Sequence, residues 1–168
     1  TGFSGMALEL MLLLTFQQAY VYLYQKTGLI TAVFMVGLAL GGYGSHRFAR
    51  HRSPVKQHRA LLRNEIALAL FAILLPFGLR NLTAAFSFRF LEGWFLLLVA
   101  IAGGLTGYEF PLVSTIYSHV QQNVGRTAGT LDSADHLGAL WGSLAVGTIL
   151  IPLIGIPFTC YLVGVLKL

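Results

Sequence analysis

Five ionisable residues stand inside long apolar stretches of this sequence: Glu9, Glu109, Asp132, Asp135 and His136. A charged side chain at the centre of a membrane helix costs roughly 2.5–3.5 kcal/mol on insertion scales, so each of them needs an explanation. Asp135 and His136 follow Asp132 by three and four positions, so these three residues share one helix face. Carboxylates and an imidazole at such depth are suited to binding a cation, relaying protons or holding a quinone headgroup.

A structural interpretation competes with this functional one. In it, the aspartates pair with nearby basic side chains, and the glutamates bond neighbouring hydroxyls and amides in a dry bundle. Pro111 closely follows Glu109, and helices that are broken at membrane depth tend to line cavities, which favours a functional role for Glu109. Both interpretations stay open for Asp135 and His136, whereas helix capping is the preferred role of Asp132.

Standard catalytic and metal-binding motifs are missing from the sequence. It contains no glycine-rich phosphate loop with a lysine, no HExxH, no CxxC and no nucleophile elbow. Cys160 is the single cysteine and lies in an apolar run, so we expect it to be a packing residue. Haem ligation is disfavoured because His119 and His136 fall on different predicted helices. We therefore expect no cofactor and no metal, and we lean against an enzyme.

Membrane helices are the elements that must position these residues. Of 168 residues, 56% are hydrophobic and 10% are charged, whereas about 25% are charged in an average soluble domain. A helix needs about 20 apolar residues to cross the membrane, and six segments reach that scale. They are roughly 3–24, 28–46, 64–82, 92–118, 129–151 and 152–168. The sequence predicts an all-α polytopic membrane bundle of about six transmembrane helices, in one domain over 1–168.

Basic residues gather between the second and third predicted helices. The predicted loop 46–63 contains six of the eleven lysines and arginines: Arg47, Arg50, Arg52, Lys56, Arg59 and Arg63. Basic residues near helix ends resist translocation, so this loop is expected to be cytoplasmic, and with six helices both termini are cytoplasmic too. With Arg126 and Lys167 counted inside, eight basic residues lie inside and three outside. The net charge of +5 is thus explained by topology in a lipid bilayer, and we expect no nucleic-acid partner.

The helix rise of ~1.5 Å per residue places all five ionisable residues in the cytoplasmic half of the membrane. Two pairs of glycines four positions apart, Gly37 with Gly41 and Gly138 with Gly142, are expected to let helix backbones pack closely. The first two helices must be joined by a tight turn at 25–28. The last two are separated by Pro152, Gly155 and Pro157.

Four stretches of the sequence carry a family resemblance. They read GFSGMALE (2–9), FMVGLALG (34–41), GYEFPL (107–112) and GRTAGTLDSADHLGA (125–139). Together they resemble the membrane region of bacterial spermidine-synthase-like proteins, in which a helical part similar to half of a major-facilitator transporter precedes a soluble aminopropyltransferase-like domain. The resemblance covers nearly the whole chain, and the block 125–139 is its most specific part.

The predicted basic loop also resembles the major-facilitator signature. Gly42, Arg47 and Arg50 are in place, but His46 stands where that signature usually has an aspartate, so the usual gating salt bridge is in doubt. A major-facilitator transporter also needs a second six-helix half. The sequence does not contain one.

The resemblance implies that aminopropyl transfer belongs to a soluble domain outside these 168 residues, so that activity is not carried over. Our first hypothesis is a non-catalytic module in the bacterial inner (cytoplasmic) membrane that anchors or assembles with a protein partner and binds a cation or polyamine. The alternative is a membrane subunit of a respiratory or electron-transfer complex, with Glu109, Asp135 and His136 serving a quinone or a proton path. The third is a half-size transporter acting as a dimer. The chain opens on Thr1 directly before an apolar run, so we expect a fragment or a processed chain.

Overall fold

The computed structural model describes the chain except for residues 20–23, 50–52, 83–87 and 119–123. The described residues form α1 (Gly2–Ala19), α2 (Tyr24–Ala49), α3 (Pro54–Leu82), α4 (Phe88–Ser118), α5 (Val124–Leu144), the π-helical η1 (Ala145–Leu150) and α6 (Ile151–Leu166). None of the described residues belongs to a strand. The all-α prediction is therefore confirmed for this part of the chain.

Four stretches of the described chain are long and apolar enough to cross a membrane. They are Lys26–Phe48, Pro54–Leu79, Glu92–Ser118 and Gly125–Leu166. Stretches of this length and apolarity indicate a membrane protein. Because α1 does not reach the same length and hydropathy, the predicted count of six spanning helices is not confirmed.

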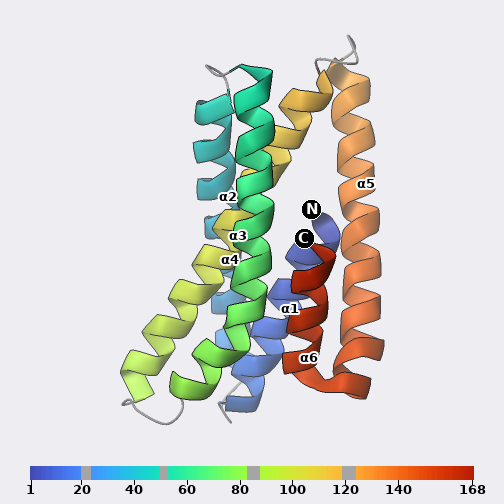
Figure 1. The fold of residues 1–168 in the computed structure, drawn as a ribbon. Helices are drawn as coiled ribbons and strands as arrows, with labels where there is room; N and C mark the ends of the chain where they lie inside the picture. The colour runs from blue at the N-terminus through green and yellow to red at the C-terminus, as the bar shows by residue number, and fades with distance from the viewer. Residues whose placement is uncertain (20–23, 50–52, 83–87, 119–123) are drawn as a thin grey trace.

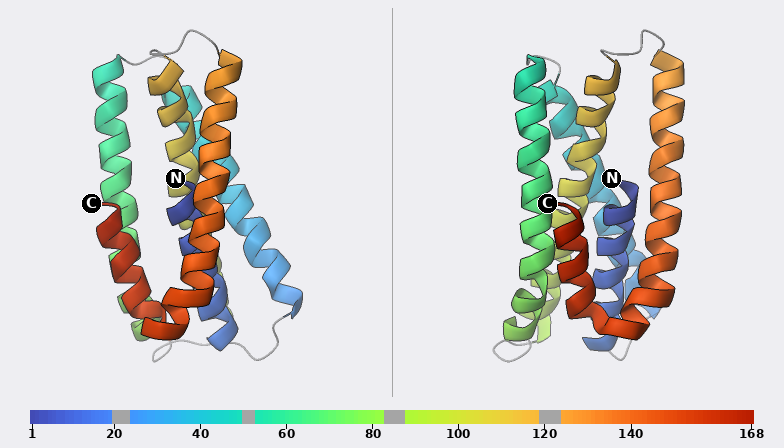
Figure 2. Two further views of the ribbon diagram at one scale, coloured as in Figure 1. Left: turned by 90° about the vertical axis from the view of Figure 1, so that its right-hand side faces the viewer. Right: turned by 45° about the vertical axis from the view of Figure 1, so that its right-hand side comes forward.

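The chain ends lie about halfway along the bundle. Figures 1 and 2 show α2, α3, α4 and α5 running along most of its length, whereas α1 and α6 occupy only the half where α3 ends and α4 begins. The prediction that both termini lie at the cytoplasmic end is therefore not supported. We call the end where α2 and α4 finish and where α3 and α5 begin the basic end, because most of the basic residues lie there.

The predicted basic loop 46–63 is mostly helical, which corrects the predicted bounds. Pro54 starts α3, and the Ser53 carbonyl accepts hydrogen bonds from the backbone N–H groups of Lys56 (2.9 Å) and Gln57 (3.1 Å). Proline suits a first helical turn because it lacks the N–H that would be unpaired there. Hydropathy detects only the apolar part of a helix, so the charged ends of α2 and α3 were assigned to a loop.

Other bounds shift for the same reason. The predicted turn 25–28 is part of the first turns of α2. The helices α4 and α5 begin at Phe88 and Val124, about one turn before the predicted starts. Polar side chains in these turns lower the local hydropathy without stopping the helix.

The chain reverses within α6, as the sequence predicted for the boundary between its last two helices. Gly155 has φ 77° and ψ 168°, which are not helical values, between Pro152 and Pro157. Glycine adopts a positive φ without the steric penalty of a side chain. Figure 1 shows the chain turning back here, so that the end of α6 runs towards the middle of the bundle.

Close backbone contact joins α2 to α4, at glycines that the sequence predicted to be packing positions. A Cβ atom on Gly37 would collide with the Ala100 carbonyl oxygen, and one on Gly41 would collide with that of Gly104. Membrane helices gain contact area through such small residues because lipid provides no hydrophobic force between them. The predicted packing role of this pair is confirmed.

The second glycine pair joins α5 to the start of α1. A Cβ atom on Gly138 would lie 3.0 Å from the Phe3 nitrogen, and one on Gly142 would lie 2.6 Å from the Phe3 carbonyl oxygen. A Cβ atom on Gly2 would collide with the Asp135 carbonyl oxygen, which makes this the tightest of the three contacts. This contact fixes the middle of α5 beside the first turn of α1.

The apolar core fills the half of the bundle that contains α1 and α6. Its fully buried side chains include Leu8, Met11 and Leu12 of α1, and the Phe16 ring lies 5.1 Å from the Phe95 ring, between centroids. The buried Cys160 Sγ lies 3.3 Å from the Met11 sulfur. Cys160 is thus a packing residue, as expected.

Candidate functional site

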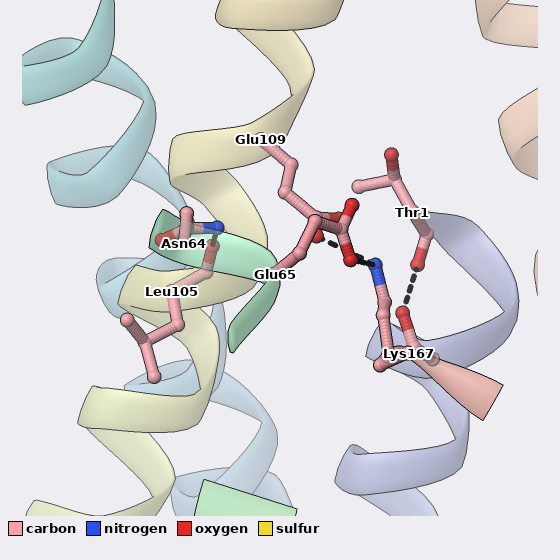
Figure 3. Close-up of polar contacts among 7 residues, drawn as sticks. Thr1, Asn64, Glu65, Leu105, Glu109 and Lys167 are labelled. Atoms are coloured by element: carbon pink, nitrogen blue, oxygen red, sulfur yellow. Dashed lines mark hydrogen bonds and ion pairs between the residues drawn. The ribbon is translucent and has the colours of Figure 1, made fainter. Parts of the chain in front are cut away.

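Lys167 connects three helices near the middle of the bundle. Its Nζ donates to Glu65 Oε2 of α3 at 2.7 Å and to Glu109 Oε1 of α4 at 2.6 Å (Figure 3). The Glu109 side chain has no exposed surface, and only 13% of the Lys167 side chain is exposed. Because an unpaired charge at such a place would be costly, these three residues depend on each other. We call them the lysine cluster.

The lysine cluster is not electrically balanced. Two carboxylates share one ammonium, which leaves one formal negative charge when all three groups are ionised. Glu109 Oε2 is buried and has no hydrogen-bond partner among the described residues. An unpaired buried acceptor of this kind is uncommon in proteins and marks a place where a further donor would fit.

Contacts among α2, α3 and α4 fix the positions of Glu65 and Glu109. Asn64 Nδ2, on the residue before Glu65, donates to the Leu105 carbonyl oxygen of α4 at 2.9 Å, one turn before Glu109 (Figure 3). Gly107, between them, lies against the Leu38 carbonyl oxygen of α2, so α4 is fixed on both sides. The positions of both carboxylates therefore follow from packing that α2, α3 and α4 make with one another.

Pro111 does not break α4, which corrects the sequence argument for Glu109. The helix continues through Pro111 to Ser118. The Thr115 hydroxyl donates to the Pro111 carbonyl oxygen at 2.7 Å, within the continuing helix. Membrane helices tolerate such prolines when neighbouring groups satisfy the freed backbone atoms.

Two cavities of about 310 Å³ each adjoin the lysine cluster and α5. The lysine cavity is lined by Thr1, Phe3, Ser4, Glu65, Val163, Leu166 and Lys167. The aspartate cavity is lined by Thr1, Leu38, Gly42, Thr106, Gly107, Phe110, Pro111, Asp132 and Asp135. Thr1 lines both, so the two cavities are neighbours.

Thr106 is a buried polar residue in the wall of the aspartate cavity. Only 6% of its surface is exposed, and its hydroxyl has no hydrogen-bond partner among the described residues. The two aspartates of α5 lie in the same wall, and Asp132 is itself well exposed, at 66% of its side chain. The cavity therefore offers oxygen acceptors from both α4 and α5.

His136 lines neither cavity. Its Nδ1 lies 2.9 Å from the Asp132 carbonyl oxygen and 3.6 Å from Asp132 Oδ1, and 77% of its side chain is exposed. Of the Asp135–His136 pair, which was predicted to face one cavity, only Asp135 lines the aspartate cavity.

Glu9 lies apart from the other predicted site residues. The helix α1, which contains Glu9, starts about halfway along the bundle and runs away from the basic end (Figure 1). The Glu9 carboxylate accepts a hydrogen bond from the Thr31 hydroxyl of α2. The prediction that all five residues share the cytoplasmic half assumed that α1 spans the whole membrane, and α1 is not among the stretches that are long and apolar enough to do so.

Sequence reasoning missed Glu65 and treated Lys167 only as a topological charge. A usable signal was present, since Lys167 is the only charged residue after Asp135 and follows a long apolar run. Buried charges in membranes pair with one another, so this cation needed an acidic partner at the same depth. Glu65 was overlooked although it is the second residue of the predicted helix 64–82.

Exposed basic residues mark one end of the bundle. Arg47 lies in the last turn of α2, Lys56 and Arg59 lie in the first turns of α3, and Arg126 lies in the first turn of α5 (Figure 1). Arg63, one turn after Arg59 in α3, is also exposed. Of the remaining predicted basic residues, Arg50 and Arg52 lie outside the described part of the chain.

A different ionic arrangement lies at the opposite end. Lys26 Nζ of α2 is 2.7 Å from Glu92 Oε2 of α4, and both side chains are partly exposed. Within the described residues, no three histidine, cysteine, aspartate or glutamate side chains are close enough to hold a metal ion.

Comparison with known proteins finds relatives named polyamine aminopropyltransferase. Those from Mycobacterium tuberculosis and Mycobacterium bovis are 32% identical over 150 residues, which are 84% of this chain and 27% of the relative. The one from Corynebacterium efficiens is 33% identical over 137 residues, which are 77% of this chain and 24% of the relative. The chain thus spans about a quarter of the length of the curated relatives that it matches.

These relatives support the predicted relation to spermidine-synthase-like proteins. No family model matches the chain. No solved structure matches it either. The predicted likeness to half of a major-facilitator transporter is therefore without support from the comparisons.

Proposed function

We propose that this chain is a multi-pass membrane module of a protein of the polyamine aminopropyltransferase kind, and that it anchors or assembles with a partner that carries the catalysis. One observation supports this most directly. The similarity to the relatives covers 84% of this helical bundle but only 27% of the M. tuberculosis protein. The matched quarter corresponds here to apolar helices of membrane-spanning length. Most of each relative lies outside that match, and we assign the catalysis there.

The proposed orientation places the basic end in the cytoplasm of a bacterium, across its inner (cytoplasmic) membrane. The positive-inside rule supports it, because the exposed basic residues gather at one end of α2, α3 and α5. In this arrangement α1 and α6 also lie in the membrane, with the lysine cluster at depth. The aspartate cavity then lies in the half nearer the cytoplasm.

The module also binds a cation, as we propose from the charges around its cavities. Glu65 lines the lysine cavity, and Asp132 and Asp135 line the aspartate cavity. Glu109 contacts Lys167, which also lines the lysine cavity. The respiratory-subunit hypothesis gains no comparable support, because His136 lies outside both cavities. No described contact favours the half-transporter hypothesis over the module.

Membrane integration and orientation can be tested together on the full chain in bacterial cells. The single native cysteine is buried, so new cysteines report on their own positions. Gly28→Cys lies near the start of α2 with no atom within 4 Å of its Cβ position, and Ser53→Cys lies exposed at the basic end. A membrane-impermeant maleimide should label Gly28→Cys in intact cells, and Ser53→Cys only after lysis. Extraction of the chain by alkaline carbonate would contradict the membrane module, and labelling of Ser53→Cys in intact cells would reverse the orientation.

A further inference from the structure

We propose that a cavity among α2, α3 and α4 at the basic end binds the headgroup of an anionic phospholipid, and that an apolar stripe along α3 holds the acyl chains of the same lipid. The proposal rests on the membrane module described above and adds a lipid that this module binds in the cytoplasmic leaflet.

The cavity, which we call the headgroup cavity, has a volume of about 260 Å³. It is lined by Phe48 of α2, Tyr108 of α4 and Ala60, Arg63, Asn64 and Ala67 of α3. The Phe48 and Tyr108 rings lie 6.2 Å apart, between centroids, and pack against the buried Ala60 and Leu112. The two alanines of α3 are small and leave the space open. The headgroup cavity thus has a largely apolar wall with one cationic side chain, that of Arg63.

The positive charge beside this cavity lacks an acidic partner. Arg59 and Arg63 lie one turn apart on α3, and both are exposed. No ion pair among the described residues involves either arginine, and the carboxylate of nearby Glu65 is paired with Lys167. A guanidinium group presents a planar fork of N–H donors that matches the oxygens of a phosphate group. A phosphate is therefore the group that these two arginines suit best.

An apolar stripe on the same face of α3 favours a lipid over a free phosphate. Residues that follow one another by three or four positions share a helix face, and here they are Arg59, Arg63, Ile66, Leu70, Leu74 and Phe77. The four apolar side chains are 49–60% exposed. The helix α3 lies along one edge of the bundle in both views of Figure 2. Its outer face therefore continues from two cations directly into apolar surface, as a phospholipid continues from phosphate into acyl chains.

The length of this stripe suits one leaflet. A helix rises by ~1.5 Å per residue, so the stretch from Arg63 to Phe77 is about 21 Å long. The hydrocarbon of one leaflet is about 15 Å thick, half of the ~30 Å core. A phosphate held at Arg63 thus leaves enough apolar helix surface for the acyl chains to lie along.

The cavity walls favour an anionic headgroup over a zwitterionic one. None of the described residues that line the cavity is acidic, so they supply no carboxylate for the ammonium group of a zwitterionic headgroup. Basic pockets between membrane helices on the cytoplasmic side are suited to anionic headgroups. The basic end has this position in the proposed orientation.

Native mass spectrometry of the full chain tests the proposal. The protein is released from mild-detergent micelles that contain equal amounts of phosphatidylglycerol and phosphatidylcholine with the same acyl chains. Wild type should retain phosphatidylglycerol in preference, and Arg63→Gln should lower the affinity for it about fivefold. Arg126→Gln is the matched control, because it removes the same charge at the same end but from α5, which does not line the cavity. It should leave the affinity unchanged.

A second variant tests the cavity without changing the charge. Ala67→Leu places a larger apolar side chain in the cavity wall and should lower the retention of phosphatidylglycerol by a similar factor. Ala67 is only half-buried and Arg63 is exposed, so both variants should fold, and circular dichroism checks this.

Three results would overturn the proposal: equal retention of the two lipids, an equal loss in Arg126→Gln and Arg63→Gln, or full retention in Ala67→Leu. Excess inorganic phosphate should not displace the lipid, and full displacement would assign the cavity to free phosphate instead. Any of these results from a carbonate-resistant protein would leave the membrane module standing and remove only the lipid site.

Discussion

Two groups of charged residues in this bundle differ in burial and in the helices that they join. At the end opposite the basic end, Lys26 pairs with Glu92, and both side chains are partly exposed, at 33% and 24%. In the middle, Lys167 serves Glu65 and the fully buried Glu109 together. The inner cluster joins α3, α4 and the end of α6, so the loss of its lysine affects contacts among all three helices.

The largest expected difference is in stability after removal of each lysine. Lys167→Gln leaves two carboxylates without their ammonium, one of them fully buried, and should destabilise the protein by roughly 3–5 kcal/mol. Lys26→Gln should cost only about 0–1 kcal/mol, because its pair is partly exposed. Unfolding of both variants in mixed micelles with increasing dodecyl sulfate gives the two values. Equal losses would show that the two clusters do not differ.

Alanine substitutions at two glycines of α4 test the same difference between the middle and the end of the bundle. A Cβ on Gly107 would collide with the Leu38 carbonyl oxygen, next to the lysine cluster, whereas one on Gly93 would meet no atom within 4 Å. Gly107→Ala should therefore destabilise by about 1–3 kcal/mol through overpacking. Gly93→Ala should stabilise by about 0.5–1 kcal/mol, because alanine is the better helix former. The dodecyl sulfate titration checks both, and a neutral Gly107→Ala would mean that α2 and α4 can separate without loss.

The hydrogen bond that orients Glu65 should have a smaller effect. Asn64 Nδ2 donates to the Leu105 carbonyl oxygen at 2.9 Å, between α3 and α4. Hydrogen bonds between membrane helices contribute about 0.6 kcal/mol on average, so Asn64→Leu should cost an amount of that order. Unfolding of Asn64→Leu in the same mixed micelles measures this loss. A loss of several kcal/mol would show that Asn64 contributes more than one hydrogen bond between α3 and α4.

The sequence located most helices because apolar runs of membrane length are easy to detect, and it found the α2 and α5 packing glycines because small residues four positions apart indicate close contact. It placed the helix ends poorly, since charged turns such as those at Lys56 and Arg59 look like loop. It also took α1 for a full span, although α1 begins halfway along the bundle.

The candidate site was found only in part, for a physical reason. Glu109, Asp132 and Asp135 can be recognised in the sequence because they are charged residues within apolar helices. Their arrangement depends on contacts between distant parts of the chain, such as Lys167 with Glu65, which no local pattern records. Glu9 looks identical to Glu109 in sequence, yet a neighbouring hydroxyl from Thr31 gives it a separate structural environment.

A pair of double-mutant cycles tests the central claim most directly. One cycle combines Lys167→Gln with Glu109→Gln, and the other combines Lys26→Gln with Glu92→Gln, with free energies of unfolding measured for all single and double variants. Residues in one buried ion pair should show a coupling energy of about 0.5–3 kcal/mol. We predict a value near the upper end of that range for Lys167 with Glu109, and one close to zero for Lys26 with Glu92. A coupling near zero for the Lys167 cycle would contradict the account, because Lys167 would then not lie between the carboxylates of α3 and α4.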